Sequence, residues 1–306
     1  MRIFGICARI AALLALAVLW TGALAEQQAN YVMNDWDYVD GSIDATAGIP
    51  EDAQGALAQI RAQGVLRVAT EPYWAPQEFI DPSLEGQARY VGADMELARL
   101  LAERMGVTLE IMPMDFQDVL TAVSEGQADL AISALAYTPR RASQVTLSKG
   151  YYFTGENAGS GLVIRAEDAD EIRSIEDLAG RDIVAQRASL QELLMAEHVF
   201  NYRQFKRLPT IEDAYRALSE GQADAAALDI ENAMTYIKEN PDCGLALVPD
   251  VRFVLPDALD GDRVAAKKGE LQLMYFVNGV IDELLASGQY QAWFDEYAEY
   301  AARLGL

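Results

Sequence analysis

The chain has 306 residues, and its 47 aspartates and glutamates outnumber its 24 lysines and arginines to give a formal net charge of −23. So acidic a surface repels nucleic acid and anionic lipid, which excludes both as expected partners. One histidine and two cysteines leave no cluster with the spacing of a zinc site, so no metal and no cofactor are expected.

The N-terminus has the make-up of a secretory signal peptide. A basic start is followed by an apolar run over residues 10–20 and by the small-x-small site Ala23-Leu24-Ala25. The run is shorter than the roughly 20 apolar residues that a membrane span requires. We expect residues 1–25 to be cleaved on export to the periplasm, leaving a soluble monomer. Its only thiol would be Cys243, so no internal disulfide could form.

Residues 26–63 are predicted to form an acidic arm and a lead-in helix. The aspartates between residues 35 and 44 leave a calcium loop as an alternative. Their spacing does not match the EF-hand pattern, however, and the glutamate of its twelfth position is absent. We therefore predict a solvated surface arm.

Strands and helices alternate along the rest of the chain. Apolar runs of strand length and amphipathic stretches of helix length succeed one another, which favours α/β layers with parallel sheets. The predicted strands are 66–70, 108–112 and 182–185, and the predicted helices are 94–105, 190–200 and one that starts at 174–178. Asp94 is predicted to cap the helix that it begins. In such sheets, ligands bind beyond the carboxyl ends of the strands.

A six-residue repeat is the most informative feature of this alternating pattern. Ser124-Glu125-Gly126-Gln127-Ala128-Asp129 recurs letter for letter at residues 219–224. Each copy follows a helix-like stretch and precedes a short apolar run, so its glycine is predicted to end the helix in a left-handed cap before a buried strand. Because the length allows about two domains of 100 to 150 residues, the repeat predicts two lobes of related build.

The chain is expected to cross twice between these lobes, at residues 159–165 and 262–268. Two crossing strands make a hinge. The predicted first lobe comprises residues 64–158 and 267–306, and the predicted second lobe comprises residues 159–266. Each lobe is predicted to hold a central, mostly parallel sheet flanked by helices.

From Gly64 onward, the chain resembles the periplasmic amino-acid-binding proteins of ABC importers, solute-binding protein family 3. The segment Thr138-Pro139-Arg140-Arg141, which follows an apolar run, carries the most specific likeness. The other matching segments are 66–76, 91–97, 131–137, 148–152, 222–229 and 286–290. The resemblance implies the two-lobed type II Venus-flytrap fold, an amino acid or related small polar ligand between the lobes, and a membrane permease that receives it.

The resemblance also assigns the two charged ends of an amino acid. Arg141 is expected to hold the ligand carboxylate, because a planar guanidinium donates two parallel hydrogen bonds to such a group, whereas Arg140 is expected to lie on the surface. Asp229 is expected to accept the ligand ammonium, with a helix N-cap as the alternative, since aspartate is a preferred cap. Trp74 is expected to place its ring against the ligand side chain.

Further ligand-site residues are predicted around this clamp, namely Ser133, Thr138, Ser189, Arg187 and Glu71. Ser189 precedes a helix whose N-terminus favours anions, and Arg187 could meet an acidic ligand side chain. Ala134, Ala136 and Leu190 stand where the family commonly has polar groups, and each missing hydroxyl costs a hydrogen bond of about 0.5–1.5 kcal/mol. The polar lining of the pocket is therefore thinner than in a standard amino-acid binder.

Two other functions remain as alternatives. The single histidine, His198, is predicted to be a surface or packing residue, and an enzyme is not expected. A dehydratase on the same fold would use a pocket carboxylate as acid or base, for which Glu71, Glu78 and Asp229 are available. The thin lining and the arm would also suit a flytrap module that carries no solute and docks on a periplasmic partner such as an oxidoreductase.

Overall fold

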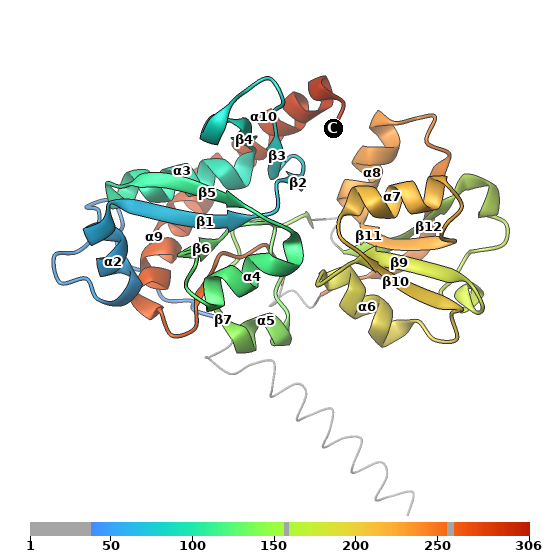
Figure 1. Ribbon diagram of the computed structural model, residues 1–306, viewed down its shortest axis with the longest axis horizontal. Coiled ribbons are helices and arrows are strands. Elements are labelled where there is room, and N and C mark those ends of the chain that lie inside the picture. Colours follow the sequence, from blue (N-terminus) through green and yellow to red (C-terminus); the bar gives the residue numbers. More distant parts are fainter. Residues whose placement is uncertain (1–37, 156–158, 256–259) are drawn as a thin grey trace, which may run out of the picture. The chain divides into compact units, whose positions relative to one another are not determined.

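The computed structural model describes residues 38–155, 159–255 and 260–306 (Figure 1). The predicted signal peptide and residues 26–37 of the predicted arm lie outside these ranges. All helices and strands named below belong to the unit Val39–Leu306. Within the described ranges, no helix combines the length and the hydropathy that crossing a membrane would take.

The first of two five-stranded sheets has the order β5-β1-β6-β13-β7. Strand β1 pairs in parallel with β5 and β6, whereas β13 pairs antiparallel with β6 and β7. The strands are β1 (Val65–Thr70), β5 (Thr108–Pro113), β6 (Leu130–Ala131), β7 (Val145–Leu147) and β13 (Ala265–Lys267). The surrounding helices are α2 (Gly55–Gln63), α3 (Ala93–Met105), α4 (Phe116–Ser124), α5 (Pro139–Gln144) and α9 (Leu271–Ser287). Helix α9, from the last part of the chain, packs beside α2, from its first described part (Figure 1).

The second sheet has the order β10-β9-β11-β8-β12. Its strands are β8 (Ser160–Arg165), β9 (Asp182–Gln186), β10 (Gln204–Leu208), β11 (Ala225–Asp229) and β12 (Leu245–Phe253). Strand β9 is parallel to β10 and β11, and β8 is antiparallel to β11 and β12. Alternate side chains of this sheet pack into two hydrophobic cores, one on each of its faces. One core includes α6 (Leu190–His198), and the other includes α7 (Ile211–Ser219) and α8 (Ile230–Glu239). Burial on both faces explains the unbroken apolar run of β11.

A small antiparallel sheet stands beside the first one. It joins β2 (Tyr73–Trp74), β3 (Glu78–Ile80) and β4 (Tyr90–Val91). Phe79 packs edge-on against Tyr297 and Tyr300 of the last helix, α10 (Gln289–Leu304), with ring centroids 6.1 and 6.0 Å away. The last helix therefore holds the strand that carries Glu78.

Most of the predicted elements have their counterparts in the structure. The three predicted strands are β1, β5 and β9, and two predicted helices are α3 and α6. The helix predicted to start at 174–178 is wrong, since only a 3-10 turn, Glu176–Leu178, forms there. Gly180 follows this turn in the left-handed region, with φ 74°, and ends it before a helix can grow.

The two copies of the repeat have the same local structure. Gly126 follows α4 with φ 78° and Gly221 follows α7 with φ 70°, which confirms the predicted left-handed glycines. Asp129 Oδ2 accepts the N–H of Arg67 on β1 at 2.9 Å, and Asp224 Oδ2 accepts the N–H of Asp182 on β9 at 2.7 Å. Each repeat thus ties a helix end to the start of a parallel strand pair.

The chain changes sheets in two places. Residues 160–165 of the first predicted crossing segment form β8 of the second sheet, and residues 265–267 of the other form β13 of the first sheet. Asp262 already forms bridges to Ala136 and Tyr152, which belong to the first sheet's side. The chain therefore passes from one side to the other before Ser160 and again between Phe253 and Asp262.

The described part of the predicted arm runs over the surface but is anchored, and we call residues 39–45 the strap. The N–H of Val39 donates to the carbonyl of Leu147 on β7 at 2.7 Å. Asn278 of α9, which is fully buried, donates to the carbonyls of Val39 and Gly41 at 2.6 and 2.8 Å. The strap thus fastens α9 to the edge of the first sheet. No group of three or more metal-binding side chains occurs among the residues that the structure describes.

Gly279 of α9 makes room for the strap and offers a test of this contact. A Cβ at Gly279 would lie 1.9 Å from the carbonyl oxygen of Ile43. Helix propensity alone would make Gly279→Ala stabilising by about 1 kcal/mol, whereas the clash should destabilise by about 1–3 kcal/mol. We expect a lower midpoint in urea unfolding, and a raised midpoint would show that the strap is not seated on α9.

Candidate ligand-binding site

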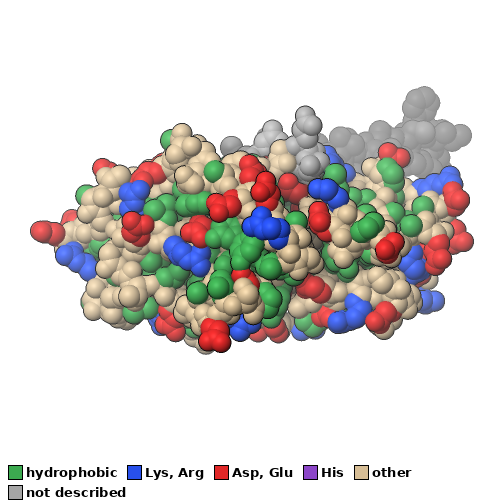
Figure 2. Space-filling model, turned by 90° about the horizontal axis from the view of Figure 1, so that it is seen from above, with side chains coloured by type: hydrophobic (Ala, Val, Ile, Leu, Met, Phe, Trp, Pro, Cys, Tyr) green, Lys and Arg blue, Asp and Glu red, His purple; other side chains and the backbone are tan. Residues whose placement is uncertain are grey.

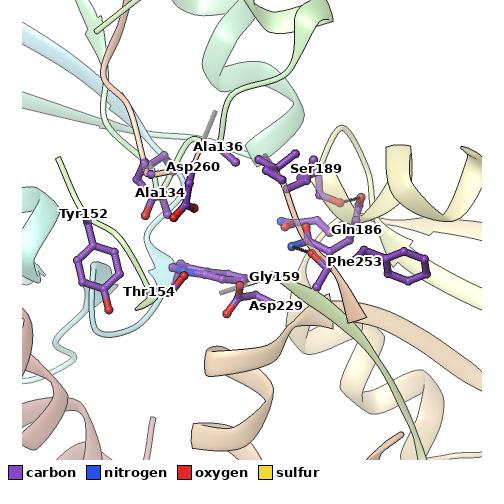
Figure 3. A pocket seen from close by; sticks show the side chains of 18 of the residues that line it. Ala134, Ala136, Tyr152, Thr154, Gly159, Gln186, Ser189, Asp229, Phe253 and Asp260 are labelled. Atoms are coloured by element: carbon purple, nitrogen blue, oxygen red, sulfur yellow. Dashed lines mark hydrogen bonds between the residues drawn. The ribbon is translucent and has the colours of Figure 1, made fainter. Parts of the chain in front are cut away.

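The candidate site is a cavity of about 430 Å³ whose wall comes from both sheets (Figure 3). Glu71 follows β1 and Ser133 follows β6, while Gln186 ends β9 and Asp229 ends β11. These are carboxyl ends of parallel strands, the edge at which α/β sheets bind ligands. A second hollow of about 600 Å³ adjoins it and shares Trp74 and Asp229. Hydrophobic side chains gather in the middle of the face in Figure 2. The second hollow is lined by aromatic and apolar side chains together with charged ones such as Glu212, Glu231 and Lys238.

Arg141 lies on the wall of the cavity, as predicted, with only 5% of its surface exposed. Thr138 caps α5 and its Oγ1 accepts the N–H of Arg141 at 3.1 Å. The guanidinium donates to the carbonyls of Ala136 at 2.6 Å and Ala188 at 3.1 Å, and it lies 5.4 Å from the ring centre of Phe116. Burial lowers the pKa of Arg141 to about 10, so the group stays charged at neutral pH. It is a desolvated cation held by carbonyls, ready for an anion.

Asp229 is the helix N-cap that the sequence left as an alternative, and it also lies on the cavity wall. Its Oδ1 accepts the N–H of Asn232 at 3.0 Å, so it caps α8. Burial raises the pKa of Asp229 to about 7. The cap fixes the carboxylate at the end of β11 and faces it toward the ligand space.

Glu71 and Gln186 connect the two sides of the cavity. Gln186 Nε2 donates to Glu71 Oε1 at 2.7 Å, and the N–H of Glu71 donates to Ser133 Oγ at 3.0 Å. Both side chains are buried, and desolvation raises the pKa of Glu71 to about 7. The hydroxyl of the predicted residue Ser133 therefore accepts a hydrogen bond from Glu71 and donates one to Glu78 at 3.1 Å.

The other predicted residues divide between the cavity and its surroundings. Trp74 and Ser189 line the cavity, and Ser189 also caps α6 by accepting the N–H of Glu192 at 3.0 Å. Thr138 is absent from the described lining and acts behind it, through its cap on Arg141. Arg187 is exposed and donates to Gln117 at 2.9 Å outside the cavity, so no anionic ligand group is expected there.

Asp94 is not the cap that its position predicted. Gly92 is the N-cap of α3, and Asp94 is the second residue of the helix and is fully buried. Its carboxylate accepts Tyr290 Oη at 2.5 Å, Tyr151 Oη at 2.8 Å and the N–H of Ala134 at 3.0 Å. Ala134 lines the cavity in the left-handed region, with φ 44°. Tertiary contacts from α10 thus override the local capping preference.

Two further carboxyl groups on the wall, Glu78 and Asp262, enlarge the acidic character of the site. Glu78 is buried, and desolvation together with the charge of Asp94 raises its pKa. Asp262 accepts Gln77 Nε2 at 2.8 Å, and burial raises its pKa to about 8. The sequence suggested Glu78 as a pocket residue but gave no signal for Asp262. Among the described lining residues, five carry carboxyl groups, whereas two, Arg141 and Arg252, are cations.

Residues 66–300 match the family model of bacterial extracellular solute-binding proteins, family 3. The chain belongs to this family. The arginine-binding extracellular protein ArtP of Bacillus subtilis is 32% identical over 166 residues, 53% of this chain and 62% of that relative. A probable histidine-binding protein of Campylobacter jejuni is 26% identical over 234 residues, 76% of this chain and 84% of the relative.

Solved structures agree with the family. An amino acid ABC transporter substrate-binding protein of Streptococcus pneumoniae, bound to L-arginine, superposes with a TM-score of 0.70 and 32% identity, over 79% of this chain and 98% of that one. An ancestral amino acid-binding protein, a precursor of cyclohexadienyl dehydratase, superposes with a TM-score of 0.67 and 25% identity, over 80% of this chain and 99% of that one. The predicted two-lobed type II fold and the predicted class, an extracytoplasmic solute-binding protein, are confirmed. The prediction that the central sheet of each lobe is mostly parallel is wrong, since each five-stranded sheet has as many antiparallel as parallel pairings.

The raised pKa values predict how the ligand-free protein responds to pH. Because Glu71 and Asp229 titrate near 7 when folded, against ordinary values of 4.5 and 3.8, the folded state binds their protons more tightly than the unfolded chain does. The free energy of unfolding should then fall as the pH rises from about 5 to about 8. Glu71→Gln should flatten this decline, and the exposed Glu103→Gln should leave it intact. A thermal midpoint that rises with pH over this window would contradict the raised pKa values.

Proposed function

We propose that this protein captures a cationic L-α-amino acid, such as arginine, between its two lobes and delivers it to the permease of an ABC importer. The excess of carboxyl groups over arginines on the cavity wall is the observation that carries the proposal. A zwitterion engages one cation and one carboxylate, so the remaining carboxyl groups call for a further positive charge. The arginine named for ArtP and bound in the Streptococcus pneumoniae structure supports this choice.

Each end of such a ligand has a partner on the wall. The desolvated guanidinium of Arg141 binds the ligand carboxylate, and Asp229 binds its ammonium group. Glu71 binds the cationic end of the side chain, whose stem lies against the ring of Trp74. Ser133 and Gln186 orient Glu71 through their hydrogen bonds to its N–H and carboxylate.

Capture is coupled to closure because the binding groups come from both sides. Arg141 and Glu71 belong to the lobe of the first sheet, and Asp229 belongs to the lobe of the second sheet. Two hydrogen bonds, Arg141 to Ala188 and Gln186 to Glu71, already join the sides in the closed arrangement. A ligand that contacts both sides binds the closed state better than the open one and shifts the population toward it.

We place the mature protein in the periplasm as a monomer, after cleavage of residues 1–25, and assign it binding rather than catalysis. The relatives reported above are named as binding proteins, and the precursor of a dehydratase among them is itself named as an amino acid-binding protein. A binding protein returns the amino acid unchanged. Mass spectrometry of the ligand after incubation would reveal any turnover.

Arg141→Ala tests the carboxylate clamp. Removing one partner of a desolvated, hydrogen-bonded charge pair costs about 2–5 kcal/mol, so L-arginine binding should weaken about 30-fold or more. Arg140→Ala, the exposed neighbour, is the matched control and should bind as the wild type does. Isothermal titration calorimetry measures both variants. Equal affinities for the two would refute the assignment of Arg141, and the absence of binding by the wild type would refute the ligand class.

Glu71→Gln tests the side-chain contact. Glutamine keeps an acceptor for Gln186 but removes the charge that would pair with a guanidinium. L-arginine should then bind about 10-fold more weakly, as expected for the loss of a charge-assisted hydrogen bond. L-citrulline, which is uncharged at the same end, should lose little affinity. An equal loss for both ligands would place the guanidinium elsewhere.

A further inference from the structure

Asp262 is a cavity carboxylate that the proposed clamp does not use. Its backbone bridges Ala136 and Tyr152, and its N–H donates to the carbonyl of Tyr152 at 3.0 Å. Both of those residues line the cavity beside it (Figure 3). Ladder contacts on two sides hold Asp262 to the first sheet's side, so its position does not depend on a ligand.

The charge of Asp262 acts on the Arg141 guanidinium and raises its pKa against the larger effect of burial, but the two groups form no ion pair. The carboxylate accepts a hydrogen bond from the uncharged amide of Gln77 at 2.8 Å, and Gln77 in turn accepts the indole N–H of Trp74 at 3.1 Å. None of the ion pairs recorded among the described residues includes Asp262. A half-buried carboxylate with only an amide partner is poorly compensated for the water it has lost.

Asp229 faces the same cavity from the other side. It ends β11 of the second sheet, whereas Asp262 belongs to the segment that re-enters the first sheet. The negative charge of Asp229 raises the pKa of Asp262, after the larger effects of burial and of Asp94. The two carboxyl groups therefore repel one another across the cavity when both are ionised.

We infer that Asp262 and Asp229 form a cross-cleft carboxylate pair that the ligand ammonium group bridges, and that their repulsion opposes closure of the empty cavity. The binding part of this inference rests on the proposed cationic amino acid. An ammonium group has three donors and can meet a carboxylate on each side at once. The ligand then supplies the charge that turns a repulsive contact between the lobes into an attractive one.

Other charged and titratable groups surround the pair, and some of them also influence the pKa values of Asp262 and Asp229. They are Asp94, Glu78, Glu231, Asp260, Arg141, Arg252 and the tyrosines Tyr151, Tyr152 and Tyr290. Asp260 is the useful comparison, because it lines the same cavity two residues from Asp262. A general effect of negative charge should appear in variants of either residue, and the pairing should appear only for Asp262.

The binding test compares Asp262→Asn with Asp260→Asn. Asparagine keeps the acceptor for Gln77 and removes the charge. L-arginine should bind Asp262→Asn about 10-fold or more weakly, as expected for a hydrogen bond to a charged group. Argininic acid, which carries a hydroxyl in place of the ammonium, should bind this variant as well as or better than the wild type. Equal losses for the two ligands, or the same pattern in Asp260→Asn, would overturn the ammonium contact.

The closure test needs no ligand and separates this inference from the proposed function. The radius of gyration of the empty wild type, measured by small-angle X-ray scattering, should rise between about pH 6 and pH 9 as the pair ionises. Asp262→Asn should stay compact over this range, and Asp260→Asn should follow the wild type. An unchanged pH response in Asp262→Asn would refute the pair. If the wild type does not bind cationic amino acids, the proposed ligand class is refuted and the repulsion between Asp262 and Asp229 is not.

Discussion

The burial of charged groups that form no ion pair within the protein is the constraint on which this site depends. Arg141 donates only to backbone carbonyls, and Glu71 accepts from an amide, although both side chains are buried. Such groups lose solvation and gain little in return, so they lower the stability of the empty protein. A ligand of complementary charge recovers that loss. The same feature that weakens the fold therefore supplies the affinity.

The strand architecture makes this arrangement possible. In each sheet, a repeat aspartate accepts a backbone N–H in the first half of the neighbouring parallel strand, Asp129 for β1 and Asp224 for β9. Fixing the starts of these strands also fixes where they end. Glu71 and Gln186 follow from β1 and β9 in corresponding places, and their hydrogen bond joins the two halves. A duplicated structural motif thus positions side chains that differ in chemistry.

Much of this molecule could be predicted from local sequence, and the remainder depends on distant contacts. Apolar runs located β1, β5 and β9, and the glycines of the repeat located two helix ends, because these signals act within a few residues. Arg141, Asp229 and Glu71 could be named from the resemblance to a family. Asp94 and Asp262 could not be assigned, since Tyr290 of α10 and Tyr151 surround the first and a bridge to Ala136 positions the second. The position of Arg187 outside the cavity could not be predicted for a related reason, since its side chain is held by a hydrogen bond to Gln117 of α4.

The strap has a consequence for the order in which the chain acquires its structure. The second sheet is built from one continuous stretch, residues 160–253, and can assemble as soon as that stretch emerges. The first sheet needs β13, and its core needs α9, to which the strap at the opposite end of the sequence is fastened. Contacts between such distant segments form slowly. The half that carries Arg141 therefore cannot complete its core until β13 and α9, near the end of the sequence, are available.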